Sequence, residues 1–220
     1  EVSSSQPGQY KMFNSKENSF FPALRPKLTV AYTLPTTVSL MQGQDSYAGA
    51  SDVWINAASP STPQSGDVSL RRESTDSIVM RFAIFAREGG PVPDNAIVHS
   101  ATLSLYKFGG PDAVIKASRL LKSFDESQAT WNVAATGTPW TTAGALGAGN
   151  DYLAAADGQT SIGDATGCTS APFPDTCWLN INVTSGVRAF AAGASNFGWK
   201  LAEVSSSQPG QYKMFNSKEN

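Results

Sequence analysis

Few side chains in this sequence have the type and spacing of a catalytic site. His99 is the single histidine, so a metal site built from several histidines is excluded. One histidine suffices for a Ser-His-Asp triad, but a position at the start of a strand explains His99 equally well. The adjacent carboxylates Asp125 and Glu126 have the chemistry of a glycosidase pair, yet they lie in a Ser-Phe-Asp-Glu-Ser turn that loop hydrogen bonds explain. The sequence therefore predicts that the protein is not an enzyme.

Aromatic and acidic side chains offer two kinds of binding site. Trp131 and Trp140 lie in a long loop rich in Gly and Thr, where an indole can stack on a sugar or can anchor the loop to the core. Anchoring is the interpretation that we favour. Asp45 and Asp52, or alternatively Asp151 and Asp157, could supply carboxylates to a structural Ca²⁺ ion, although the spacing matches no EF-hand. No other cofactor is expected.

The two cysteines, Cys168 and Cys177, are separated by eight residues that include two prolines. With two thiols and no nearby histidine, a zinc site is disfavoured. We expect a disulfide that closes the loop, which implies an oxidising compartment. Two free thiols in a cytosolic protein are the alternative.

Low charge excludes several partners. Charged residues are 15% of the chain and the formal net charge is −2, so the clustered Lys and Arg of nucleic-acid or anionic-membrane binding are missing. No apolar run approaches the ~20 residues that span a bilayer. We expect a prokaryotic protein that is secreted or displayed at the cell surface.

Alternating apolar and polar residues dominate the secondary-structure signal. Residues 27–33, 101–108 and 178–183 alternate with the period of a strand, and residues 77–85 are almost continuously apolar, as in a strand buried on both faces. Helix is scarce, and the best candidate covers residues 186–192. Many short strands separated by Pro and Gly clusters predict an all-β fold, an antiparallel, jelly-roll-like β-sandwich with at most one short helix.

Residues 1–18, EVSSSQPGQYKMFNSKEN, recur letter for letter as residues 203–220. We call these segments copy one and copy two. Their offset of 202 residues has the length of a whole domain, far beyond the period of a solenoid. We therefore expect residues 1–33 to be the last strands of one repeat, and residues 34–220 to be the next repeat without its final strand. A single permuted domain, and donation of residues 1–33 to a neighbouring subunit, are the alternatives.

The junction between repeats is expected just after copy one. Tyr32, Thr33, Leu34, Pro35 and Thr36 form a short linker whose proline limits flexibility. The apolar side chains of Phe20 and Phe21 are candidates for contact at this interface, with packing in a core as the competing role.

One stretch resembles a known family. Residues 123–132, SFDESQATWN, followed by Gly137-Thr-Pro-Trp140 and later by residues 182–190 and 196–201, resemble DNRLRE domains. Residues 25–32 resemble the terminal strand of that family. The resemblance implies a secreted β-sandwich module, and some members are classed as carbohydrate-binding modules.

Two functions follow from these observations. The first is a structural repeat unit of an extracellular tandem-repeat filament, stalk or adhesin, whose partners are copies of itself joined head to tail. The alternative is an extracellular carbohydrate-binding module that recognises a matrix or cell-wall polysaccharide, with repetition adding avidity.

Overall fold

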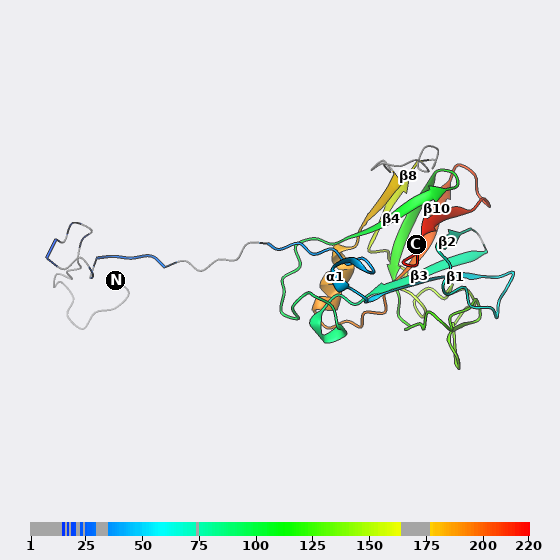
Figure 1. The fold of residues 1–220 in the computed structure, drawn as a ribbon, viewed down its shortest axis with the longest axis horizontal. Helices are drawn as coiled ribbons and strands as arrows, with labels where there is room; N and C mark the ends of the chain where they lie inside the picture. The colour runs from blue at the N-terminus through cyan, green and yellow to red at the C-terminus, as the bar shows by residue number, and fades with distance from the viewer. Residues whose placement is uncertain are drawn as a thin grey trace. The chain divides into compact units, whose positions relative to one another are not determined.

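The computed structural model describes residues 15, 17, 19–20, 23, 25–29, 35–73, 75–163 and 177–220. The chain divides into two units, Glu1–Thr36 and Thr37–Asn220 (Figure 1). The predicted repeat boundary between residues 33 and 34 lies outside the described residues. The predicted strand at residues 27–33 is not seen over its described part, because residues 27–29 have no regular secondary structure. A strand needs a partner to satisfy its backbone groups, and the sequence pattern alone does not supply one.

The second unit is an antiparallel all-β sandwich with one α-helix among its described residues, as predicted (Figure 1). The first sheet has the strand order β1 (Ala50–Asn56), β3 (Asp76–Phe82), β10 (Trp199–Ser206), β5 (Ala113–Arg119) and β8 (Gly158–Ile162). The second sheet has the order β2 (Ser69–Arg72), β11 (Lys213–Asn216), β4 (Thr102–Gly109) and β9 (Trp178–Asn182). The remaining elements are β6 (Val133–Ala135), β7 (Thr138–Pro139), α1 (Thr184–Ala191) and the 3-10 turns Gln44–Ser46 and Ala86–Glu88.

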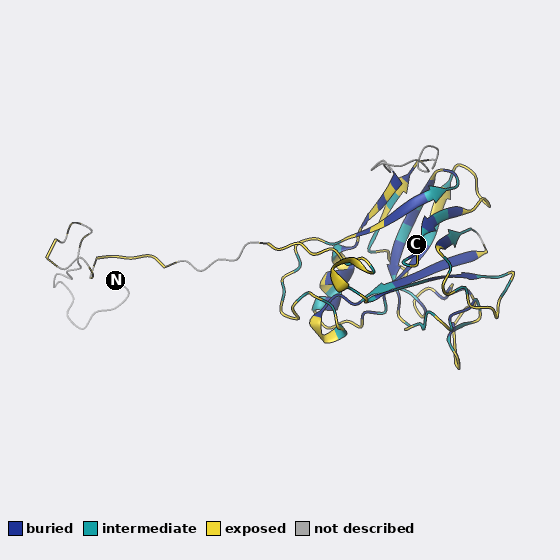
Figure 2. Cartoon of the chain, viewed as in Figure 1, coloured by how far each residue is buried: buried dark blue, intermediate teal, exposed yellow. Residues whose placement is uncertain are grey.

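The main core lies between the two sheets. In β4 and β9 the alternation of the sequence turns one face inward, and Leu103, Leu105, Leu179 and Ile181 are buried there (Figure 2). Helix α1 adds Phe190, whose ring meets that of Trp199 edge-on with centroids 5.4 Å apart. The strand period thus decides which side chains form the core.

A second core lies on the outer face of the five-stranded sheet. Val53, Ile55 and Val79 point away from the sandwich and pack with the side chains of residues 120–157, which we call the loop layer. Strand β3 is therefore buried on both faces, as its apolar run predicted. The loop layer buries that face against apolar side chains rather than against a third sheet.

Candidate functional site

Copy two is part of the sandwich. Its residues form the second half of β10 and all of β11. Strand β11 pairs antiparallel with β2 along one edge and with β4 along the other. Lys213 and Phe215 are fully buried. Without copy two the second sheet would be divided between β2 and β4, so the repeated sequence encodes a central structural element.

Copy two also contains the partner of its own buried charge. Lys213 Nζ lies 2.8 Å from an Oε2 atom of Glu203 and donates a hydrogen bond of 3.2 Å to the carbonyl of Gln208. A buried ammonium group is tolerated only when it is paired in this way. Because all three residues belong to the repeated sequence, copy one carries the same set as Glu1, Gln6 and Lys11.

After β11 the chain turns from one sheet to the other. Ser217 donates its backbone N–H to the carbonyl of Val68, at 3.1 Å, and its hydroxyl to Asp52 Oδ1, at 2.8 Å. The N–H of Lys218 donates to Asp52 Oδ2, also at 2.8 Å. Asp52 lies in β1, so copy two closes one side of the sandwich. Burial raises the pKa of Asp52, although the hydrogen bonds from Ser217 and Lys218 oppose that rise.

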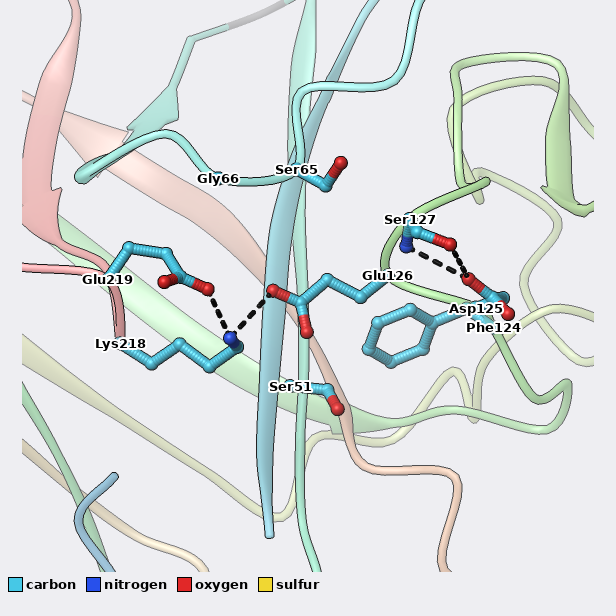
Figure 3. A pocket seen from close by; sticks show the side chains of 9 residues that line it. All are labelled: Ser51, Ser65, Gly66, Phe124, Asp125, Glu126, Ser127, Lys218 and Glu219. Atoms are coloured by element: carbon cyan, nitrogen blue, oxygen red, sulfur yellow. Dashed lines mark hydrogen bonds and ion pairs between the residues drawn. The ribbon is translucent and has the colours of Figure 1, made fainter. Parts of the chain in front are cut away.

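The Lys218 side chain lies between two carboxylates (Figure 3). Its Nζ is 3.1 Å from Glu126 Oε1 and also contacts Glu219. Burial lowers the pKa of Lys218, but hydrogen bonds to Glu219 and Glu126 outweigh it and raise the pKa above its ordinary value. Burial also raises the pKa of Glu126, against the effect of the Lys218 hydrogen bond.

A groove of about 530 Å³ opens beside this contact, and we call it the junction groove (Figure 3). It is lined by Ser51, Ser65, Gly66, Phe124, Asp125, Glu126, Ser127, Lys218 and Glu219. These residues come from β1, from the loop between β1 and β2, from the start of the loop layer and from the end of copy two. The groove therefore lies where copy two leaves the sandwich.

The acidic pair of the sequence analysis lines this groove but is engaged structurally. Asp125 Oδ1 accepts hydrogen bonds from the N–H and the hydroxyl of Ser127, at 2.9 and 2.6 Å. Glu126 is paired with Lys218. Both carboxylates of the pair are therefore held in structural contacts. His99 lies elsewhere, in the loop before β4, where its backbone carbonyl accepts a hydrogen bond of 2.9 Å from Arg188 in α1.

Both candidate sugar-stacking residues pack in the second core. Trp140 is 4% exposed, and its indole N–H donates to the carbonyl of Thr130 at 2.9 Å. Trp131 is half-buried against the same cluster. Its indole ring lies so close to Gly144 that a Cβ atom on residue 144 would be 2.4 Å from the ring. Gly144 also has a φ of +78°, so both the space and the backbone conformation require glycine at this position. Trp140 thus leaves little surface for a ligand.

The first pair of candidate calcium ligands, Asp45 and Asp52, does not form a metal site. Asp45 lies in a 3-10 turn with a φ of 50°, and both oxygens of Asp52 accept hydrogen bonds from copy two. Within the described part of the chain, no group of three or more His, Cys, Asp or Glu side chains is placed to hold a metal ion.

The other two candidate calcium ligands, Asp151 and Asp157, are held by hydrogen bonds within the sandwich. Asp151 is fully buried and accepts hydrogen bonds from the N–H groups of Thr141, Thr142 and Gly147, at 2.7, 3.0 and 3.0 Å. Lys122 Nζ adds an ion pair at 3.3 Å. Burial raises the pKa of Asp151, but the backbone donors outweigh it and lower the pKa below its ordinary value.

Asp157 joins three elements in a similar way. It accepts from Arg119 in β5, from the Trp199 indole in β10 and from Ser185 in α1, at 3.1, 2.8 and 3.0 Å. An aspartate next to glycines in a loop, as at residues 147–151 and 157–158, is the sequence signal for such a site.

Several predicted residues lie outside the described part of the chain. They are Cys168, Phe21, Tyr32, Thr33 and Leu34. The disulfide between Cys168 and Cys177 therefore stays a prediction. Cys177 itself is buried beside Tyr106 and Phe108. Pro35 and Thr36 are exposed, and Phe20 is 88% exposed.

No protein-family model and no curated protein sequence matches this chain. The resemblance to DNRLRE domains rests on the quoted motifs and stays a prediction. No helix in the described ranges is both long and apolar enough to cross a membrane.

Proposed function

We propose that the chain is a structural repeat unit of an extracellular tandem-repeat filament, stalk or adhesin, with about 202 residues per repeat joined head to tail. The supporting observation is the position of copy two. It supplies β11, the strand between β2 and β4, together with the buried side chains of Lys213 and Phe215. Copy one has the same sequence and so needs the same surroundings, which a preceding repeat would provide.

Head-to-tail repetition accounts for the other features of the sequence. A contact between identical modules that does not close into a ring generates a filament. Pro35 stiffens the segment that joins the two units. The low charge, the predicted disulfide and the resemblance to secreted β-sandwich modules support an extracellular location.

The mass of the native material under denaturing and reducing conditions tests this proposal. A tandem polymer gives a species or ladder far above the 23.2 kDa of this chain. A single species at 23.2 kDa would contradict it. Reduction matters because it removes any polymer held together by disulfides alone.

A further inference from the structure

We propose that Asn182 is an N-glycosylation site, to which an oligosaccharide is transferred from a polyprenyl diphosphate. Asn182, Val183 and Thr184 form the Asn-X-Thr triplet that glycosyl acceptors of this kind share. No other asparagine of the sequence has Ser or Thr two residues later. A triplet arises easily by chance, so the surroundings of Asn182 in the fold matter more than the motif itself.

The Asn182 side chain points out of the sandwich. Strand β9 buries Leu179 and Ile181 in the main core. Because successive side chains of a strand point to opposite faces, Asn180 and Asn182 are exposed on the other side. Thr102 lies directly opposite Asn182 on β4 and is also exposed. Both neighbours on this face, Asn180 and Thr102, are small, so a bulky hydrophilic group has room there without disturbing the core.

The amide nitrogen that receives the sugar is available in the fold. Asn182 Oδ1 accepts a hydrogen bond of 3.0 Å from the N–H of Thr184, at the start of α1. Its Nδ2 donates to no group within the described residues. Glycosylation replaces one hydrogen on Nδ2 and leaves the carbonyl oxygen as an acceptor, so the modified side chain keeps the turn into α1.

The transfer needs no reactant besides the lipid-linked oligosaccharide. Nδ2 of Asn182 forms a bond to C1 of the first sugar, and the bond from C1 to the diphosphate oxygen breaks. The polyprenyl diphosphate leaves with that electron pair, and Nδ2 loses one proton. No atom changes its oxidation state through loss of electrons to a further partner, so the step balances.

The fold also indicates when the transfer occurs. The hydroxyl of Thr184, which completes the acceptor triplet, is bonded to Ala101 on both sides of that residue. It accepts from the N–H of Ala101 at 2.9 Å and donates to the carbonyl of Ala101 at 3.4 Å. A transferase that reads this hydroxyl must therefore act before the segment leading into β4 packs on the turn, while the chain is still unfolded.

The inference rests on one part of the proposed function, the extracellular location, because a secreted chain is the usual acceptor of such glycans. It does not depend on the tandem repeat. In a head-to-tail polymer of these units, the outward face of β4 and β9 would carry the glycan and would be unavailable for contact between neighbouring filaments.

Mass spectrometry of the native material tests the site. The protein is digested, and the peptide that contains Asn182 is fragmented by electron transfer, which leaves side-chain modifications in place. We expect the mass of this peptide to exceed that of the bare peptide by the mass of a glycan, with the addition on residue 182. Bare Asn182, or an addition on another residue of the peptide, would overturn the proposal.

Two pairs of variants of the full chain, made in the organism of origin, separate the site from its surroundings. Asn182→Gln should abolish the glycan, whereas Asn180→Gln should keep it, since both asparagines lie on the same exposed face of β9. Thr184→Ala should abolish it and Thr184→Ser should retain it, because serine restores the hydroxyl. A glycan that persists in Asn182→Gln or in Thr184→Ala, or that is lost equally in Asn180→Gln, would contradict the proposal.

The two proposals fail in different ways. Native material of high mass with bare Asn182 overturns the glycosylation site and leaves the tandem repeat standing. A glycosylated single unit gives one species just above 23.2 kDa instead of a ladder, which keeps the site and removes the tandem repeat.

Discussion

The loop layer and copy two both complete the sandwich, but they hold their buried carboxylates differently. In the loop layer, Asp151 accepts three backbone N–H groups and pairs with Lys122, and its pKa is lowered. In the contact with copy two, Asp52 has two donors, and burial raises its pKa. Glu126 beside it shows the same rise.

The two regions differ in how many hydrogen-bond donors reach their buried carboxylates. A carboxylate with enough donors stabilises its surroundings as an anion. For Asp52 and Glu126 the hydrogen-bond donors do not offset the cost of removing water from the anion, so the pKa of each is raised. The junction groove lies beside them. The carboxylate of Asp151 in the loop layer is thus supplied with enough donors to stay charged, whereas Asp52 and Glu126 in the contact with copy two are not.

The largest effect is expected in the second core. Trp140→Ala should lower the free energy of unfolding by about 3–5 kcal/mol, because it empties a buried site and removes the hydrogen bond to Thr130. Urea unfolding followed by circular dichroism measures the change. Leu146→Ala, on an exposed side chain of the same layer, is the control and should change stability by less than about 1 kcal/mol. A small loss at Trp140 would mean that the layer does not stabilise the sheet.

Asp151→Asn should cost about 2–3 kcal/mol in the same assay, because the amide removes the charge and turns an N–H donor toward backbone donors. Asp45→Asn, in the exposed turn, is the matched control and should have little effect. An Asp151→Asn variant as stable as the parent chain would show that the charge at this position is not needed.

Asp52→Asn should cost less than about 1 kcal/mol, since burial already disfavours the anion and an amide oxygen still accepts one of the two hydrogen bonds. Asp52→Ala loses both bonds and should cost more than the asparagine variant. Equal costs for the asparagine substitutions at residues 52 and 151 would erase the contrast between the two regions.

A further prediction concerns the dependence of stability on pH. Burial, with a contribution from Glu73, raises the pKa of Asp76 from 3.8 to about 6, and its Oδ2 has no hydrogen-bond partner. The folded state then binds this proton more tightly than the unfolded state, so stability falls as the pH rises from about 4 to about 6. Asp76→Asn should remove this fall, so that the urea midpoint of unfolding changes less between pH 4 and pH 6. If the midpoint of the variant still falls as steeply with pH, other titrating groups cause the fall.

Local pattern predicted much of the fold. The alternation in residues 101–108 and 178–183 placed Leu103 and Leu179 correctly, because a strand exposes opposite faces at successive residues. Burial of β3 on both faces followed from its apolar run. The strand predicted at residues 27–33 had the same pattern, but no sheet partner is present for residues 27–29.

Long-range contacts explain what the sequence did not reveal. Asp52 was a candidate calcium ligand because nothing nearby in the sequence indicates that Ser217, 165 residues away, would occupy it. The junction groove combines segments from four parts of the chain and has no local motif.

Identical substitutions in the two copies give the most direct test of that role. Phe215→Ala and Phe13→Ala change the same residue within the same 18-residue sequence. At concentrations where the chain is monomeric, we expect Phe215→Ala to lower the free energy of unfolding of the sandwich by about 3–5 kcal/mol, because Phe215 is fully buried. Phe13→Ala should leave it unchanged. Equal losses, or a loss from Phe13→Ala alone, would mean that copy one shares or takes the place of β11 in its own chain, and would contradict the repeat organisation.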